Sequence, residues 1–143
     1  MKIAIGCDHA AFEVKNKIKD LLTDFDHQVI DLGTDNEDSV DYPLYGHAVA
    51  RKVAEKEVDK GIVICGSGIG ISIAANKIKG IRAALCTSTT HAELSRKHND
   101  SNILALGARL TEYDEIKSIV KVWLETSFEG GRHLNRIKMI EIL

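Results

Sequence analysis

The sequence predicts an α/β fold: a doubly wound, five-stranded parallel sheet with helices on both faces, a three-layer sandwich. Short β-rich runs alternate along the chain with longer segments in which apolar residues recur at three- and four-residue steps, as Val14, Ile18 and Leu22 do. This alternation is typical of βαβ units, which place strands in parallel. A length of 143 residues fits one domain, so we expect a single domain over residues 1–143.

Each element is expected from its local pattern. The β-rich runs predict five strands: Lys2–Gly6, His27–Asp31, Gly61–Cys65, Arg82–Cys86 and Ile103–Leu106. The helical patterns predict six helices, at about Ala11–Thr23, Leu44–Lys56, Ile69–Lys77, Thr89–Arg96, Glu112–Ser127 and Arg132–Ile142. The polar stretch 33–43 is expected to be a loop over a site, because Pro43 disfavours helix at Tyr42.

The expected order of the strands predicts where a ligand binds. Five strands wound in this way commonly follow the order 2-1-3-4-5, and ligands bind beyond the carboxyl ends of strands one and three, where the winding reverses. The residues found there are GCDHA (6–10) and CGSGIG (65–70). We therefore expect these two chemically rich stretches to face one crevice.

Composition restricts the class of partner. The formal net charge is -2, and 5% of the residues are aromatic, so binding to nucleic acid or to a membrane surface is not expected. No apolar run approaches the ~20 residues that cross a bilayer, and the N-terminus lacks an apolar signal core, which predicts a cytoplasmic protein. The three cysteines are widely spaced, and no close Cys/His pair predicts a metal site or a disulfide framework.

The stretch VICGSGIGIS, residues 63–72, carries three alternate glycines after an apolar strand. Gly66 and Gly68 begin a dinucleotide-binding pattern, but its third position falls on Ile71, and no Gly-Lys-Ser/Thr closes a P-loop. The best argument for a nucleotide cofactor therefore fails. Backbone N–H groups of such a loop can converge on a negative charge at the positive end of the next helix. The alternative is a tight turn in which glycine only relieves crowding, and the loop alone leaves both interpretations open.

Cys65 lies at the junction between this strand and the loop. A thiol beside a helix N-terminus should have its thiolate form favoured. A base next to an anion-binding loop suits removal of a proton alpha to a carbonyl, which generates an enediolate. We interpret Cys7 and Cys86 as small buried hydrophobic residues.

Several stretches together resemble the ribose-5-phosphate isomerase B family, which also contains the galactose-6-phosphate isomerase subunits. They run from Lys2 to about Arg136 and read GCDHAAFEVK, DYP, CGSGIGISIAANKIKGIRAALC, SRKHNDSNILALGARL and FEGGRH. The resemblance implies a Rossmann-like or flavodoxin-like fold and an aldose–ketose isomerase of the pentose phosphate pathway that uses neither metal nor organic cofactor. It also implies homodimers, or tetramers of two dimers, with active sites at the subunit interface.

The resemblance gives the loop its chemistry. Cys65 matches the general base that moves a proton between C1 and C2, and Ser67 stands where many relatives carry a Thr that helps to shuttle protons between O1 and O2. Serine keeps the hydroxyl but lacks the methyl group that restricts its rotamers. The enediolate oxygens would be held by the remaining loop residues, Gly66, Gly68, Ile69 and Gly70.

Other polar residues obtain roles from the same resemblance. His98 would open the furanose ring and Asn99 would hold a sugar hydroxyl, although on the residues alone a polar helix cap is the simpler interpretation. Asp8 and His9 would contact the ring oxygen and hydroxyls, whereas Asp8 could also merely cap a helix. Tyr42 would pack over the sugar, or be a surface aromatic residue on a loop.

Three arginines match the family's phosphate-binding residues: Arg109, Arg132 and Arg136. Arg132 and Arg136 are four residues apart and share one face of the last expected helix, and guanidinium groups suit phosphate oxygens. Each alone could belong to a solvated basic face. We expect the last helix, about 132–142, to reach a partner subunit. The remaining histidines considered are interpreted as structural or surface residues: His27, His47, His91 and His133.

The most favoured function is interconversion of D-ribose 5-phosphate and D-ribulose 5-phosphate. Within the family, the alternative is a six-carbon substrate such as galactose 6-phosphate or allose 6-phosphate. From other classes, a non-catalytic phosphosugar-binding module would need the arginines but no base. A flavin carrier is disfavoured because the glycine loop does not follow the first strand.

Overall fold

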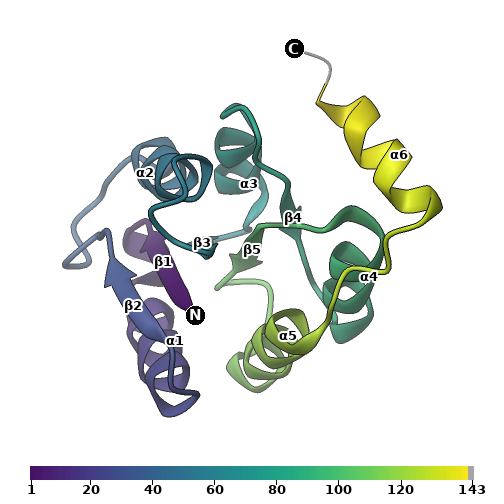
Figure 1. Cartoon of the computed structure of the whole chain (residues 1–143). Coiled ribbons are helices and arrows are strands. Elements are labelled where there is room, and N and C mark those ends of the chain that lie inside the picture. Colours follow the sequence, from purple (N-terminus) through teal and green to yellow (C-terminus); the bar gives the residue numbers. More distant parts are fainter. Residues whose placement is uncertain (142–143) are drawn as a thin grey trace.

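The computed structural model describes residues 1–141 and contains one sheet of five parallel strands, in the order β2-β1-β3-β5-β4 (Figure 1). The strands are β1 (Lys2–Cys7), β2 (Gln28–Asp31), β3 (Lys60–Cys65), β4 (Ala83–Leu85) and β5 (Ile103–Gly107). The predicted doubly wound α/β class is confirmed.

The predicted strand order is wrong in its second half, because β5 lies beside β3 and β4 forms the edge. β5 is buried along its whole length, whereas the three residues of β4 are all partly exposed. A strand covered on both faces is apolar throughout, and a short strand suits an edge. β1 and β3 remain neighbours, so the reversal of the winding lies where it was predicted.

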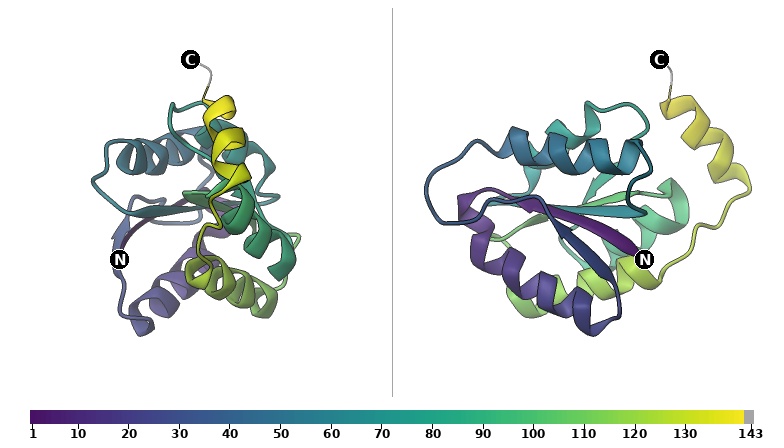
Figure 2. Two further views of the ribbon diagram at one scale, coloured as in Figure 1. Left: turned by 45° about the vertical axis from the view of Figure 1, so that its right-hand side comes forward. Right: turned by 60° about the vertical axis from the view of Figure 1, so that its left-hand side comes forward.

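Helices cover both faces of the sheet, and one helix lies apart at its edge (Figure 2). They are α1 (Phe12–Asp24), α2 (Tyr42–Ala54), α3 (Ile69–Asn76), α4 (Thr89–Asn99), α5 (Tyr113–Glu125) and α6 (Arg132–Ile140), and the short 3-10 helix η1 (His9–Ala11) precedes α1. α2 and α3 pack together on one face, and α1, α4 and α5 lie on the other. α6 packs against α4 near the edge strand β4.

Two apolar clusters fill the space between the layers. Trp123 of α5 and Ile18 of α1 belong to the cluster on one face, and both are completely buried. Val49 of α2 and Ile71 of α3 belong to the cluster on the other face. Burial of apolar side chains on both faces stabilises the central strands and holds the strand ends in fixed positions.

Two helix boundaries differ from the prediction for identifiable local reasons. α2 begins at Tyr42, since Pro43 falls in the first helical turn, where its missing N–H removes no helical hydrogen bond. α4 continues through Asn99 to a left-handed cap at Asp100, which pairs with Arg96 one turn earlier. The predicted end of the last helix, Ile142, lies outside the described residues.

A buried lysine anchors the loop that precedes α2. Lys15 of α1 is 1% exposed, and its Nζ donates to Asp31 Oδ1 at 2.8 Å and to the carbonyl oxygen of Thr34 at 2.5 Å. Lys19 donates to the other carboxylate oxygen of Asp31 at 2.6 Å from a side chain that is 34% exposed. Burial of Asp31 opposes its charge, but the lysine hydrogen bonds more than offset this, so its pKa lies below the ordinary value.

We predict that Lys15→Met lowers the free energy of unfolding by about 2–3 kcal/mol, because Asp31 loses a partner and the buried Thr34 carbonyl loses its donor. Lys19→Met, the matched control at the same carboxylate, should cost less than about 1 kcal/mol because that pair is exposed. Urea denaturation measures both. A group with a lowered folded pKa stabilises above its unfolded pKa, so the Lys15 effect should shrink as the pH falls below about 4. Equal losses for the two variants would contradict this view of the anchor.

Candidate active site

The glycine loop wraps its backbone around the sulfur atom of Cys65. Cys65 ends β3 and is 4% exposed, and the N–H of Gly68 donates to its Sγ at 3.1 Å. The N–H of Ile69 donates to Ser67 Oγ at 3.2 Å, and α3 begins at Ile69. The positive end of a helix favours negative charge in the space beside the sulfur.

Two glycines allow this shape. Gly68 has φ +77°, and a Cβ placed on it would lie 2.7 Å from the carbonyl carbon of Leu106 in β5. A Cβ on Gly107, at the end of β5, would lie 2.5 Å from the carbonyl oxygen of Ser67. The loop therefore requires glycine both for its backbone conformation and for its contact with β5. Relief of crowding, one of the two interpretations that the sequence left open, is therefore present, while the N–H groups of Gly68 and Ile69 donate to Cys65 and Ser67.

Arg109 lies directly against the loop. Its N–H donates to the Gly66 carbonyl at 2.9 Å, and a Cβ on Gly66 would lie 3.5 Å from Arg109 Nη1. Among residues 1–141, the Arg109 side chain forms no ion pair within 4.0 Å. A guanidinium group beside a loop of N–H donors makes the carboxyl end of the sheet suited to an anionic ligand.

Asp8 and His9 directly follow β1 and lie at the same carboxyl end of the sheet, because β1 and β3 are paired neighbours. Asp8 is 7% exposed, and its Oδ1 accepts from the N–H of Ala10 at 3.0 Å, so the predicted capping role is present. His9 Nδ1 accepts from the N–H of Val40 at 3.1 Å. This contact ties the loop before α2 to the site, and in the neutral imidazole it leaves the proton on Nε2 as a donor.

Tyr42 reaches the loop from the first turn of α2. A Cβ placed on Gly70 would lie 2.7 Å from its phenolic oxygen, so the ring rests directly on the first turn of α3. Tyr42 is 39% exposed. The expectation that Tyr42 lies on a loop is wrong, but its position beside the glycine loop agrees with a role in covering a ligand.

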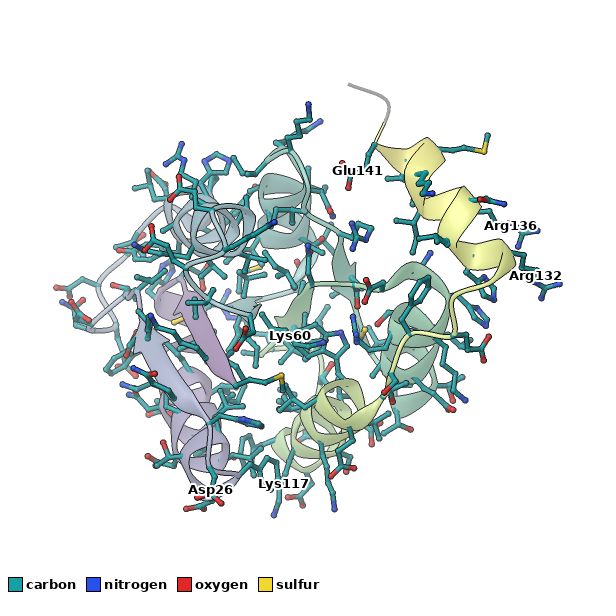
Figure 3. All side chains as sticks on the ribbon, in the orientation of Figure 1. Asp26, Lys60, Lys117, Arg132, Arg136 and Glu141 are labelled. Atoms are coloured by element: carbon teal, nitrogen blue, oxygen red, sulfur yellow. The ribbon has the colours of Figure 1, made fainter. Side chains whose placement is uncertain are left out.

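A second group of predicted residues lies near the amino ends of the strands, opposite to the glycine loop. The main-chain carbonyl of Asn99, in the last turn of α4, accepts from Nε of Arg82, just before β4. The expectation that His98 and Asn99 follow the helix is wrong, because both belong to it. Arg132 and Arg136 lie on the exposed surface of α6 and point away from the sheet (Figure 3).

The two groups do not meet within one chain. Asn99 lies by the amino ends of the strands, whereas Cys65 is at the carboxyl end of β3, and the six residues of β3 span about 16 Å at ~3.3 Å per step. The two stretches that were expected to face one crevice, GCDHA and CGSGIG, do follow neighbouring strands. Tyr42 and Arg109 lie beside the second stretch, but His98, Asn99, Arg132 and Arg136 form a separate group.

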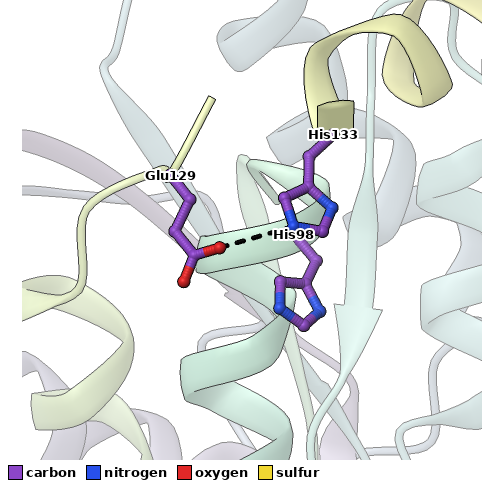
Figure 4. A group of neighbouring side chains, drawn as sticks. All are labelled: His98, Glu129 and His133. Carbon is purple, nitrogen blue, oxygen red and sulfur yellow. Dashed lines mark ion pairs between the residues drawn. The ribbon is translucent and has the colours of Figure 1, made fainter. Parts of the chain in front are cut away.

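His133, which the sequence analysis interpreted as a structural or surface residue, is buried beside His98. Its ring stacks on that of His98 with centroids 4.3 Å apart, and its Nε2 lies 3.4 Å from Glu129 Oε2 (Figure 4). His133 is 7% exposed. Its four-residue spacing from Glu129 was a signal for their pairing, but nothing in the sequence pointed to His98 as a neighbour.

The other two cysteines behave as expected for buried hydrophobic residues. Burial raises the pKa of the Cys7 thiol to about 11, and it does the same for Cys86. Neither thiol is ionised near neutral pH. Within residues 1–141, the helices lack the combination of length and apolar character needed to cross a membrane.

These features describe a doubly wound α/β protein with a glycine loop and a thiol at its switch point, and comparisons with known proteins identify the family. The family model described as "Ribose/Galactose Isomerase" matches residues 3–140. Ribose-5-phosphate isomerase B of Escherichia coli (strain K12) is 50% identical over 139 residues, which cover 97% of this chain and 93% of that protein. The chain belongs to the ribose/galactose isomerase family, and it is an isomerase.

Two further relatives show how wide this family is. The structure of ribose-5-phosphate isomerase B from Clostridium thermocellum superimposes with a TM-score of 0.98 at 52% identity, covering 99% of this chain and 95% of that one. A galactose-6-phosphate isomerase subunit of Clostridium acetobutylicum is 43% identical over 96% of this chain and 79% of its own length. Both sugar specificities therefore occur among close relatives.

We predict that Gly68→Ala destabilises the chain more than Gly80→Ala. Both glycines have positive φ, which costs an alanine about 1–2 kcal/mol, but a Cβ on Gly80 meets no atom within 4 Å. The Gly68 variant also crowds the backbone of β5, which should add about 1–3 kcal/mol. Urea unfolding of both variants measures the difference, and equal losses would show that the loop tolerates a side chain at Gly68.

Proposed function

We propose that the chain interconverts D-ribose 5-phosphate and D-ribulose 5-phosphate, as a cytoplasmic enzyme of the pentose phosphate pathway. The observation that carries the proposal is the hydrogen bond from the N–H of Gly68 to the Cys65 sulfur at the start of the helix α3. Arg109 lies beside this loop. Aldose–ketose isomerisation needs a base next to a group that stabilises an enediolate. Membership of the isomerase family supports this reaction. We propose that the reaction uses no cofactor.

The proposed proton transfer uses the loop directly. The Cys65 thiolate removes the C2 proton of the open-chain aldose, the electron pair forms the C1–C2 double bond, and the charge moves to O1. The protonated thiol returns that proton to C1, while Ser67 passes the O2 proton to O1, which gives the ketose. Loop N–H groups between Gly66 and Gly70 stabilise the charged oxygens, and Asp8 and His9 orient the sugar hydroxyls.

The remaining residues act from a second subunit. His98 would open the furanose ring, Asn99 would hold a hydroxyl, and Arg132 and Arg136 would bind the phosphate in the partner's site. Their distance from Cys65 within one chain supports sharing, since a two-fold dimer forms two equivalent composite sites. The chain would be one domain, with α6 as an arm that reaches the partner, in a homodimer or a tetramer of two dimers.

Exposed apolar residues support such an interface. Ile69 and Ile73 on α3 are 52% and 55% exposed, and Leu110 after β5 is 72% exposed. Apolar side chains gathered beside a site are typical of surfaces that another chain covers.

A six-carbon substrate is the second candidate, because one relative is a galactose-6-phosphate isomerase subunit at 43% identity. An additional carbon changes the distance between the enediolate and the phosphate. That distance depends on how the partner's arginines approach the loop.

The purified chain should isomerise ribose 5-phosphate with a kcat/KM at least about tenfold above that for allose 6-phosphate or galactose 6-phosphate, as a site built for five carbons misaligns a longer sugar. A coupled assay of ketose formation measures all three substrates. Cys65→Ala is the control, and it should lower the rate at least ~10²-fold while substrate binding by calorimetry persists. Preference for a hexose phosphate would favour the second candidate. Binding without turnover of any substrate would favour a phosphosugar-binding module.

We predict that mixing Cys65→Ala and Arg136→Ala homodimers restores activity. Each parent should be nearly inactive, but a mixed dimer carries both lesions in one site and leaves the other intact. Random exchange then restores about a quarter of wild-type activity. Mass spectrometry measures the exchange, and the coupled assay measures the activity.

A second mixture serves as the matched control. Arg109 lies against the loop of its own chain, so Cys65→Ala mixed with Arg109→Ala leaves one lesion in each site and restores nothing. Equal behaviour of the two mixtures, after verified exchange, would disprove the sharing of Arg136 between subunits.

A further inference from the structure

We propose that His98, Glu129 and His133 form a Zn²⁺ site that inhibits the isomerase. The three residues come from the last turn of α4, the segment before α6 and the first turn of α6 (Figure 4). Their ligand atoms all lie within 4.8 Å of one another. The sequence predicted no metal site, because His98 and His133 are 35 positions apart and only the packing of α6 on α4 joins them.

The donor set selects the metal. Two imidazole nitrogens and one carboxylate oxygen form the ligand set of three-ligand zinc sites, which leave a fourth position open. Imidazole donors favour Zn²⁺, Co²⁺, Ni²⁺ and Cu²⁺ over Mg²⁺ and Ca²⁺, which prefer oxygen. The ring of His133 is already oriented by burial and by its contact with Glu129, so less conformational freedom is lost on binding.

A modest rearrangement closes the site around an ion. Tetrahedral bonds of about 2.1 Å place ligand atoms about 3.4 Å apart, so the group must contract by roughly 1 Å. The stacked rings lie only 14° from parallel, and one ring must turn for both nitrogens to face one ion. Glu129 is half exposed and precedes Gly130 and Gly131, where a Cβ would meet nothing within 4 Å. The segment that carries the carboxylate therefore has room to move.

The surrounding charges are mixed and do not exclude a cation. Lys97 precedes His98 but pairs with Glu93 at 2.5 Å, and its carbonyl accepts from the N–H of Glu129. Arg132 precedes His133 and is exposed, so solvent screens its repulsion of an ion. Glu129 places one negative charge within the group itself.

Inhibition follows from the identity of the ligands and depends on the proposed function. A ring nitrogen of His98 that is bound to Zn²⁺ no longer exchanges a proton with the furanose oxygen, so ring opening slows. Zinc would then act as a reversible brake on the isomerase.

The test measures Zn²⁺ binding without any sugar, by competition of the untagged dimer with a chromophoric chelator. Glu129→Gln, a conservative change of a half-exposed side chain, should weaken binding at least about tenfold, and His133→Gln should do the same. His91→Gln is the matched control, since His91 is an exposed histidine in the first turn of α4 and should leave the affinity unchanged. Bound Co²⁺ should show tetrahedral d–d absorption without a thiolate charge-transfer band.

Unchanged affinity in Glu129→Gln and His133→Gln, or a thiolate band from Cys65, would overturn the metal site. Zinc should also inhibit turnover, and Glu129→Gln should require at least about tenfold more Zn²⁺ for the same inhibition. Tight binding at these residues with no effect on turnover would overturn the inhibitory role. Failure of the sugar assays alone would count against the proposed reaction and leave the binding result standing.

Discussion

The site depends on one hydrogen bond, from the N–H of Gly68 to the sulfur of Cys65, and on the backbone conformation that allows it. Gly68 has φ +77° and lies against Leu106, so the loop turns back over the end of its own strand instead of leaving the sheet. The helix α3 then begins directly beside the sulfur. A thiol, an N–H donor and a helix dipole are thereby fixed before any ligand arrives, which is the preorganisation that electrostatic catalysis requires.

The parallel sheet brings the other groups to this loop. The register of β1, β3 and β5 aligns Cys7, Ile64 and Leu106, so the residues after all three strands meet at one edge. Lys15 supports this edge from beneath, because it joins Asp31 to the carbonyl of Thr34 at the start of the loop that leads to Tyr42.

The same topology separates Cys65, proposed to transfer the proton, from His98, proposed to open the ring. A helix that follows a parallel strand runs back toward the amino ends, so the last turn of α4 cannot lie beside Cys65. The arrangement leaves His98 beside His133 and Glu129, in a cluster that one chain assembles alone. The proposed dimer would bring this cluster to the loop of a partner. The same imidazole would then serve proton exchange in the absence of zinc and coordinate the ion in its presence.

The sequence by itself determined the class of fold, the reversal of the winding between β1 and β3, and the loop group of the site. These depend on local periodicity, on glycine positions and on residues that directly follow a strand. Tertiary structure alone decided that β5 lies inside β4, because strand order depends on which strand gains more from burial on both faces. It also decided that His98 meets His133. Contacts between residues 35 positions apart arise from the packing of α6 on α4, and no local pattern encodes that packing.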